Sequence, residues 1–314
     1  IFLYIDAIKL PPSKCFYYYT IIFVFLLLKV INVITLIAFM NIIKYDKLSA
    51  KGELLMSKNP VLEVKNISMI YHTLNGEVEA ISDIDFKVYE GEIIGIVGPS
   101  GCGKSTLLSI ISGLITPSSG EVIVKGRKVT KPSKNIGYMF QRDHLLEWRN
   151  ILQNVLLGLE IQNRVDKKAV EKAEKLLDTY GLGEFKESYP RQLSGGMRQR
   201  AALIRTLMVE PELLLLDEPF SALDYQTRLA ISDEIGLILK NENKTTLMVT
   251  HDIAEAISIS DRIIILSNRP AKIKDIIDIE LTCPNNKWSP INCREAPEFR
   301  HYFNRIWKEL DIHV

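Results

Sequence analysis

The stretch Ile93-Ile94-Gly95-Ile96-Val97-Gly98-Pro99-Ser100-Gly101-Cys102-Gly103-Lys104-Ser105 decides the fold of this chain. Its opening run, 93–97, is apolar throughout, which is typical of a central strand buried on both faces of a parallel sheet. The following residues fit the pattern G-x-x-x-x-G-K-[ST], whose glycines let backbone N–H groups turn inward around a phosphate. We expect a helix to begin near Lys104, with its positive end and the ammonium facing an anion and the Ser105 hydroxyl available to Mg²⁺. The stretch therefore predicts a strand, a phosphate-binding loop and a helix.

Alternating residues before the loop predict a small antiparallel layer. Leu62-Glu63-Val64 and Ile84-Asp85-Phe86-Lys87-Val88 alternate between apolar and polar residues, and the turn residues Asn75-Gly76 lie between them. Beyond the loop, 120–126 has the pattern of a hairpin arm and 136–140 that of another strand. We therefore expect a sheet with exposed polar positions beside the buried parallel one.

The second half of the chain alternates between helical and strand patterns. Between about 150 and 208 the apolar residues recur with a helical period, most clearly at 165–180. Short apolar strands follow, separated by helical stretches, at 213–216, 246–250 and 262–266. This alternation is typical of a doubly wound parallel sheet, so we predict an α/β protein with an antiparallel β layer and a helical insert. A last helix is expected at about 297–310.

The composition indicates that specific sites, not overall charge, carry the function. The 314 residues, 47% of them hydrophobic, can bury a core of ordinary size. Thirty-nine basic and thirty-eight acidic residues give a formal net charge of +1, so no nucleic-acid partner is expected. The four cysteines have the spacing of neither a zinc site nor a dense disulfide framework, and a reducing compartment fits them best. Cys102 is interpreted as a small residue filling the tight turn.

Residues 1–55 differ from the rest of the chain. The stretch from about Cys15 to Ile43 is apolar over a length that could span a bilayer. It is either one membrane helix or, as we expect, translated upstream sequence. Three features favour the second interpretation: the chain begins at Ile1, residues with A- and T-rich codons dominate, and Met56 opens a polar stretch just before the strand pattern starts. A signal peptide is disfavoured, since the apolar stretch is too long and no small-residue cleavage site follows it.

Two adjacent carboxylates follow an apolar run in the second half of the chain. Leu213-Leu214-Leu215-Leu216 predicts a buried strand, and Asp217 and Glu218 come at its carboxyl end, the edge at which parallel sheets bind ligands. Asp217 is the candidate to hold the Mg²⁺ shell, and Glu218 to orient and polarise the attacking water. Alone, this pattern also fits a solvated strand end; combined with a phosphate-binding loop it predicts phosphoryl transfer.

A third motif, Leu193-Ser194-Gly195-Gly196-Met197-Arg198-Gln199-Arg200, opens a further predicted helix. Ser194 can cap that helix, and the paired glycines permit close approach of an anion to its N-terminus. An ordinary capped helix is the alternative, because the first loop already accounts for the phosphates of one nucleotide.

The segment Ser194-Gly195-Gly196-Met197-Arg198-Gln199 resembles the signature of ABC ATPases, which belong to the P-loop NTPases. The resemblance extends from about Val61 to Ser267. It implies an ATPase in which two subunits pack head to tail, so that the signature helix of one binds the γ-phosphate of ATP held by the loop of the other. With the apolar extension at 1–55 set apart by its composition, we expect an ATPase domain at 56–270 with a helical subdomain at about 141–208, and a C-terminal extension at 271–314.

The resemblance assigns four catalytic residues: Lys104, Gln141, Glu218 and His251. Gln141 follows the strand 136–140 and resembles the Q-loop glutamine, which contacts Mg²⁺ and the attacking water. His251 resembles the switch histidine, which contacts the γ-phosphate and helps to position Glu218. The implied Mg²⁺ ligands are Ser105, Gln141 and Asp217.

The implied ATP contacts come from all the motifs together. They are Gly98, Pro99, Ser100, Gly101, Cys102, Gly103, Lys104, Ser105 and Thr106 in the first loop, Ser194, Gly195 and Gly196 in the signature, and Asp224 in Ser221-Ala222-Leu223-Asp224, which resembles the D-loop. Tyr71 resembles the aromatic residue that stacks on adenine, a contact that recognises a planar base without polar matching. Packing of Tyr71 against the antiparallel layer is the alternative.

A narrower resemblance concerns the residues after the Q-loop glutamine. Phe140 to Asn150, together with 154–160 and the tail around Arg294, is similar to the nitrate, sulfonate and taurine importer ATPases of bacteria. This resemblance implies a homodimer or a pair with a similar ATPase subunit, bound to transmembrane permease subunits at the cytoplasmic face of the cell membrane. An extracytoplasmic solute-binding protein is an indirect partner.

Two alternatives belong to other classes. A soluble ABC ATPase acting on DNA or ribosomes usually has a coiled-coil insertion or two ATPase domains in one chain, and neither pattern occurs in this sequence. A half-transporter with a genuine N-terminal span needs most of its membrane domain elsewhere, because one helix cannot form a translocation path.

Overall fold

The computed structural model describes residues 59–73, 76–221, 223–284 and 288–310. The predicted apolar extension at 1–55 lies outside these residues. Within the described ranges, no helix is both long enough and apolar enough to cross a membrane.

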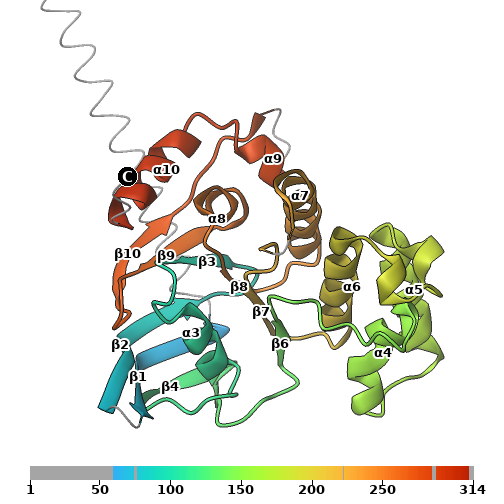
Figure 1. The fold of residues 1–314 in the computed structure, drawn as a ribbon, viewed down its shortest axis with the longest axis horizontal. Helices are drawn as coiled ribbons and strands as arrows, with labels where there is room; N and C mark the ends of the chain where they lie inside the picture. Colours follow the sequence, from blue (N-terminus) through green and yellow to red (C-terminus); the bar gives the residue numbers. More distant parts are fainter. Residues whose placement is uncertain (1–58, 74–75, 222, 285–287, 311–314) are drawn as a thin grey trace, which may run out of the picture. The chain divides into compact units, whose positions relative to one another are not determined.

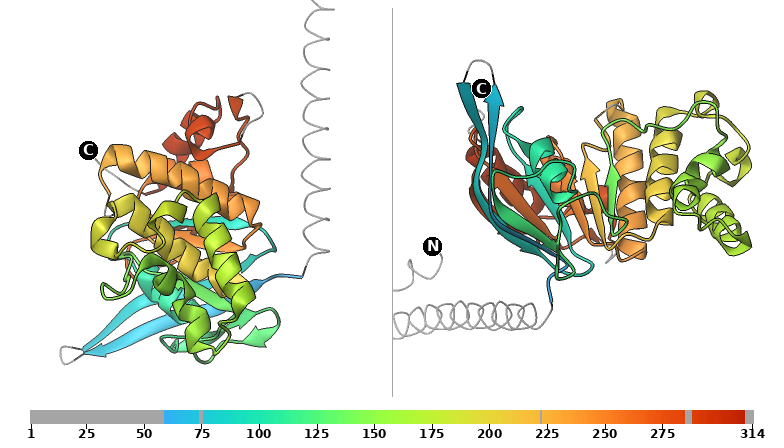
Figure 2. Two further views of the ribbon diagram at one scale, coloured as in Figure 1. Left: turned by 90° about the vertical axis from the view of Figure 1, so that its right-hand side faces the viewer. Right: turned by 90° about the horizontal axis from the view of Figure 1, so that it is seen from below.

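The first sheet is the predicted antiparallel layer. Strands β1 (Leu62–Thr73) and β2 (Gly76–Val88) form a hairpin that pairs from Leu62 and Val88 to Thr73 and Gly76. Strand β4 (Ser119–Val124) pairs with the other edge of β1, and β5 (Arg127–Lys128) completes the order β2-β1-β4-β5. The layer lies at one side of the six-stranded sheet (Figure 2).

The second sheet confirms the predicted parallel core. Its strand order is β10 (Ile273–Asp278), β9 (Arg262–Leu266), β3 (Ile93–Val97), β8 (Thr246–Val249), β7 (Leu213–Asp217) and β6 (Ile136–Met139). Strand β3 pairs in parallel with β8 and β9, and only β10 runs antiparallel to its neighbour. Because β3 is central and all its residues are buried, the loop that follows it begins in the middle of the sheet edge.

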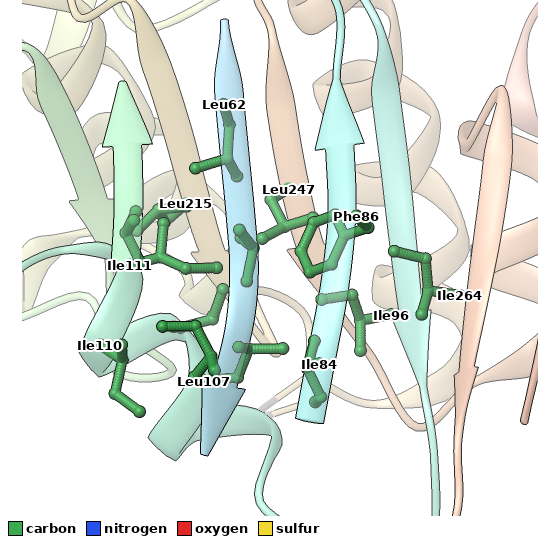
Figure 3. Close-up of a cluster of buried hydrophobic side chains, with 14 of the residues drawn as sticks. Leu62, Ile84, Phe86, Ile96, Leu107, Ile110, Ile111, Leu215, Leu247 and Ile264 are labelled. Atoms are coloured by element: carbon green, nitrogen blue, oxygen red, sulfur yellow. The ribbon is translucent and has the colours of Figure 1, made fainter. Parts of the chain in front are cut away.

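The parallel sheet is covered on both faces, which explains its continuous apolar strands. On one face, alternate residues such as Ile96, Leu215 and Leu247 pack against α3 (Lys104–Ile111) and the antiparallel layer (Figure 3). On the other, the intervening residues, such as Leu214 and Leu216, pack against α6 (Gly195–Met208) and α7 (Tyr225–Asn241). Helices α8 (Ile253–Ile259) and α10 (Phe299–Glu309) cover the rest of that face.

The predicted helical insert consists of α4 (Ile151–Ile161), α5 (Lys167–Thr179) and α6, with short turns η2 (Gly183–Phe185) and η3 (Pro190–Gln192) between α5 and α6. Asn150 and Asp166 cap the first two helices, which fixes where each begins. Helices α4 and α5 lie beside α6, away from the antiparallel layer (Figures 1 and 2). The signature motif therefore lies where the insert joins the sheet.

The C-terminal segment folds back over α7 and α8 through α9 (Pro290–Cys293) and α10. Cys283 and Cys293 form a disulfide, with their Cα atoms 4.6 Å apart. The spacing of the cysteines along the sequence did not predict this pair, and the expectation of reduced cysteines is wrong for it. Docking of α9 on α7 and α8 brings the two residues together, whereas Cys102 is free and buried.

Candidate functional site

The loop after β3 has the geometry expected of a phosphate-binding loop. Gly101 and Gly103 have φ angles of 72° and 126°, in the left-handed region that favours glycine. Gly103 caps α3 without a side-chain hydrogen bond, so the N–H groups of the first turn are available to an anion. Lys104 is only 6% exposed, and its Nζ donates to the carbonyl oxygens of Gly98 and Pro99 at 2.8 and 3.0 Å.

The remaining loop residues divide into exposed and buried positions. Ser100, Gly101 and Ser105 are exposed, as nucleotide contact requires. Cys102 is buried, and burial raises the pKa of its thiol, in agreement with its interpretation as a residue that fills the turn. A contact that sequence reasoning missed comes from Arg269, whose guanidinium donates to the Gly101 carbonyl at 2.8 Å.

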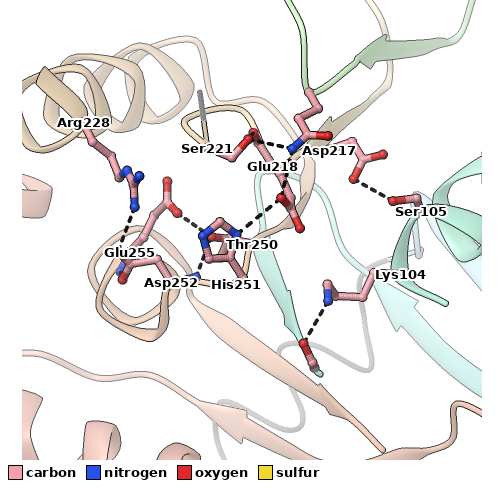
Figure 4. A network of polar contacts seen from close by, with 12 residues as sticks. Lys104, Ser105, Asp217, Glu218, Ser221, Arg228, Thr250, His251, Asp252 and Glu255 are labelled. Carbon is pink, nitrogen blue, oxygen red and sulfur yellow. Dashed lines mark hydrogen bonds and ion pairs between the residues drawn. The ribbon is translucent and has the colours of Figure 1, made fainter. Parts of the chain in front are cut away.

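Asp217, at the end of β7, is held by two hydroxyl groups. Ser105 Oγ donates to Asp217 Oδ1 at 3.2 Å, and the Tyr138 hydroxyl donates to Asp217 Oδ2 at 3.1 Å. Burial raises the pKa of Asp217, and these hydrogen bonds partly oppose the shift. Burial, with the nearby Asp217 charge, also raises the pKa of the Tyr138 hydroxyl, which keeps it a donor. The side chain of Ser105 and that of Asp217 thus converge, as predicted, beside Lys104 (Figure 4).

Glu218 follows Asp217 but leaves the direction of the strand. Its φ of 46° is uncommon for a residue other than glycine, and such backbone strain tends to occur at functional sites. Its Oε2 accepts from Gln141 Nε2 at 3.3 Å and lies 3.3 Å from His251 Nδ1 (Figure 4). Gln141 also donates to Ser221 Oγ at 3.0 Å, and Ser221 donates to the Glu218 carbonyl. Three residues predicted as catalytic are therefore adjacent.

The signature motif begins α6 as predicted. Ser194 is exposed and caps the helix, accepting from Met197 N at 3.3 Å. Gly196, however, faces inward, because a Cβ atom there would lie 2.6 Å from Ile231 Cδ1 of α7. Gly196 thus permits close packing of α6 on α7, a role that sequence reasoning missed. No direct contact joins Ser194 to Lys104 or Glu218 among the described residues. The signature helix α6 is linked to the site through Gln199, which donates to the Gln141 carbonyl at 3.4 Å.

Two predicted nucleotide contacts have structural roles in the chain. Asp224 caps α7, accepting from Thr227 N at 3.1 Å, and its hydrogen bonds with Thr227 lower its pKa. Tyr71 lies in β1 opposite Val78 and packs partly buried against the core below the antiparallel layer. Their contacts with ATP stay predictions.

The donor set fits Mg²⁺ better than a softer metal. Among the residues that the structure describes, no group of three or more histidine, cysteine, aspartate and glutamate side chains could hold a metal. Oxygen atoms of Ser105 and Asp217 lie together, and the Gln141 amide uses its nitrogen for the bonds to Glu218 and Ser221. Mg²⁺ prefers such oxygen ligands and usually completes its shell with phosphates and water.

Comparison with known proteins agrees with this arrangement. The family described as "ABC transporter" matches residues 81–221. An uncharacterized ABC transporter ATP-binding protein of Bacillus subtilis is 47% identical over 80% of this chain and 95% of its own length. An aliphatic sulfonates import ATP-binding protein of Bacillus thuringiensis is 39% identical, covering 73% and 90% of the two chains. A nitrate import ATP-binding protein of Synechocystis is also 39% identical, covering 78% and 93%.

The fold is likewise similar to solved structures. An ATP-binding cassette in a dimeric post-hydrolysis state, bound to ADP and Pi, is 31% identical with a TM-score of 0.59. The match covers 70% of this chain and 99% of the other.

Proposed function

The chain belongs to the ABC transporter family as an ATP-binding subunit with ATPase activity, and we propose that two copies close around two ATP molecules to drive an importer. One observation carries this proposal. The loop residues, both carboxylates, Gln141 and His251 converge at one sheet edge, while the exposed Ser194 makes no direct contact with Lys104 or Glu218 among the described residues. The N-terminal end of α6 can bind a second phosphate, but it does not face the nucleotide loop of its own chain. It is therefore available to the nucleotide loop of another copy.

The residues of the first loop bind and orient the triphosphate. Within the described residues, the buried Lys104 ammonium donates hydrogen bonds to neutral carbonyl oxygens, so an anionic phosphate is a better partner for its charge. Ser105, Asp217 and Gln141 would hold a Mg²⁺ ion, which would supply charge neutralisation for the transferred phosphoryl group. Tyr138 and Ser105 orient the Asp217 carboxylate for that role.

Glu218 is the group that orients the attacking water and accepts its proton. The left-handed backbone at Glu218 directs its carboxylate out of the strand, and Gln141 and His251 hold Oε2 from two sides. Phosphoryl transfer depends mainly on such positioning and on charge stabilisation. His251 lies in the loop that follows β8. From this position it can contact the γ-phosphate and Glu218 at the same time.

The segment from Phe140 to Asn150 is our proposed contact with the permease. Phe140 and Trp148 are 43% and 73% exposed, and exposed aromatic residues of this size often mark protein interfaces. The buried Asn154 holds the segment through bonds with Leu146, Arg149 and Asn150. Closure of the ATPases can then move the permease, because a braced segment transmits displacement.

We further propose an anion such as nitrate, a sulfonate or taurine as the solute. The sulfonate and nitrate import relatives support this class, and an extracytoplasmic solute-binding protein would deliver the solute to the permease. The chain is placed at the cytoplasmic face of the membrane. Uptake of labelled nitrate, taurine and alkyl sulfonates, compared between cells with and without this chain, tests the substrate class. If the uptake of each of the three compounds is the same in cells with and without this chain, the proposed solute class is wrong. The ATPase assignment is untouched by that result.

Glu218→Gln tests the paired mechanism. We expect the variant to lose steady-state hydrolysis and to accumulate an ATP-bound dimer, measured by light scattering after size exclusion. Glu212→Gln is the matched control, since Glu212 is an exposed carboxylate paired with Lys125 just before the same strand. Adding Ser194→Trp to the Glu218→Gln variant should return it to a monomer. A Glu218→Gln protein that stays monomeric with ATP, or a dimer that tolerates Ser194→Trp, contradicts the proposal.

A further inference from the structure

A buried polar cluster lies directly behind His251. Thr250 and Glu255 are 2% and 3% exposed, and the Thr250 hydroxyl donates to Glu255 Oε2 (Figure 4). Thr250 Oγ1 also accepts from Asp252 N at 3.0 Å, and Asp252 Oδ1 accepts from Glu255 N at 3.0 Å. These bonds fix the backbone on both sides of His251. They therefore determine the direction in which His251 approaches Glu218.

Glu255 has charged neighbours on several elements. Asp252 caps α8, the helix of Glu255, while Arg228 lies on α7 and Arg294 at the end of α9; α8 also packs against β3 and α10. Burial, the largest effect, raises the pKa of Glu255 to about 8, Asp252 adds to the shift, and the two arginines oppose it. Glu255 Oε1 is buried with no hydrogen-bond partner among the described residues. One of the two Glu255 oxygens therefore has no partner in this cluster, which is costly for a buried polar group.

Arg294 is delivered by the C-terminal segment, whose docking is specific. Pro290 fits against Gly236 of α7, where a Cβ atom would lie 2.6 Å from Pro290 Cγ. Ile291 N donates to Asp233 Oδ1 at 2.8 Å, and Lys240 lies 4.1 Å from the ring centroid of Trp288. The disulfide at Cys293, the residue before Arg294, closes the segment. This docking places Arg294 at the end of α9, which packs against α8, and the Arg294 Nε is buried without a hydrogen-bond partner among the described residues. No hydrogen bond or ion pair joins Arg294 to Glu255 in the described part of the chain, so Arg294 acts on Glu255 through its charge, which lowers the pKa of that carboxyl.

Arg228 joins the same cluster to the loop 221–224. Its guanidinium donates to the Leu223 carbonyl at 3.1 Å and lies 3.9 Å from Asp252 Oδ2. The cluster therefore connects three parts of the chain that are distant in sequence: the loop before α7, the His251 loop and the C-terminal segment.

We propose that Glu255 is a positioning residue for His251, acting through its hydrogen bond with Thr250, and that Arg294 of the C-terminal segment supports the Glu255 side chain through its charge. The proposal rests on the role of His251 proposed above. Glu255 and Arg294 touch no substrate; they act by keeping the Thr250–Asp252 backbone in place. Loss of either group leaves the nucleotide loop intact and turns His251 away from Glu218, so hydrolysis slows while ATP binding changes little.

Single-turnover hydrolysis by the full chain tests the proposal. We expect Thr250→Val and Glu255→Ala each to lower the hydrolysis rate by about tenfold, the size of one lost buried hydrogen bond, with less than about a twofold change in ATP affinity. Arg294→Met removes a charge and no hydrogen bond to Glu255, so it should lower the rate by a smaller factor. Thr250→Ser keeps the hydroxyl and should restore the rate. Arg300→Met, at an exposed position of α10, is the matched control and should hydrolyse ATP like the unaltered protein. Equal rates for Arg294→Met and Arg300→Met overturn the role of Arg294.

A double-mutant cycle with His251→Ala separates this inference from the proposed function. If Glu255 and Arg294 act through His251, adding either substitution to His251→Ala costs nothing further. Additive losses overturn the inference and leave the role of His251 standing. Unchanged hydrolysis in His251→Ala alone overturns the proposed function of His251 itself. For a variant that folds poorly, the ¹⁵N chemical shifts of His251 in histidine-labelled protein provide the second readout. They should move with Arg294→Met and stay unchanged with Arg300→Met, and the reverse result overturns the proposal.

Discussion

Tyr138→Phe isolates the hydrogen bond that orients the proposed Mg²⁺ ligand. Tyr138 donates to Asp217 Oδ2 at 3.1 Å, while Ser105 donates to the other oxygen. Phenylalanine keeps the ring, which packs partly buried against the core and contacts Phe140 at a centroid distance of 4.4 Å. The substitution therefore removes one donor from a buried carboxylate and leaves the packing intact.

The expected size of the effect follows from the charge of the acceptor. A hydrogen bond to a charged group contributes about 1.5–3 kcal/mol, which corresponds to roughly 10- to 150-fold in an equilibrium constant. Groups that orient a metal ligand typically change metal affinity by about 10- to 100-fold. We expect the Mg²⁺ concentration that gives half-maximal ATPase activity to rise by about tenfold or more in Tyr138→Phe, while the rate at saturating Mg²⁺ falls less.

The assay is a Mg²⁺ titration of ATP hydrolysis at saturating ATP. Tyr180→Phe is the matched control, because Tyr180 also donates to a carboxylate, Glu242 Oε1 at 2.9 Å, but on the exposed surface away from the site. That variant should titrate like the unaltered protein. If Tyr138→Phe has the same Mg²⁺ midpoint as Tyr180→Phe, then Tyr138 does not orient Asp217 for the metal and the reasoning is refuted.

Three other predictions concern stability. Asn154→Ala removes four hydrogen bonds to partly buried backbone groups of the segment 146–150, so we expect a loss of about 2–4 kcal/mol in the free energy of unfolding, measured by urea titration. A loss below about 1 kcal/mol would show that water replaces the amide. Gly196→Ala places a Cβ atom 2.6 Å from Ile231 Cδ1 and should lower the free energy of unfolding by about 1–3 kcal/mol. The double variant Gly196→Ala,Ile231→Val should recover part of that loss in the same experiment, and no recovery would exclude overpacking as the cause. Because the pKa of Glu255 is raised from 4.5 to about 8, its contribution to stability is complete below pH 4.5 and is lost as the pH rises through 8, by at most about 1.4 kcal/mol per pH unit. In thermal melts at a series of pH values, Glu255→Gln should lack this decline. Parallel curves of melting temperature against pH for the two proteins would disprove the prediction.

Local sequence patterns predicted the elements of the site but not all of its contacts. The run 93–105 predicted β3, the loop and α3, because consecutive residues carry both the strand pattern and the glycine positions. Cys102 was interpreted as a turn-filling residue, and it is buried in the turn. The packing role of Gly196 was missed, because a glycine pattern does not show that another helix crosses at that residue; its contact with ATP stays a prediction. The disulfide between Cys283 and Cys293 was missed for a related reason, since its geometry depends on where α9 docks.

The sequence alone determined the strand, loop and helix order, the identity of Lys104, Asp217 and Glu218 as chemical groups, and the capped signature helix, since each depends on neighbours within a few residues. Only the tertiary structure decided that Tyr138 supports Asp217, 79 positions away, and that the C-terminal segment packs through α9 against α8, the helix of Glu255. Such pairs form where separately folded elements cross, and the crossing is set by packing of the whole core, which no local pattern of residues contains.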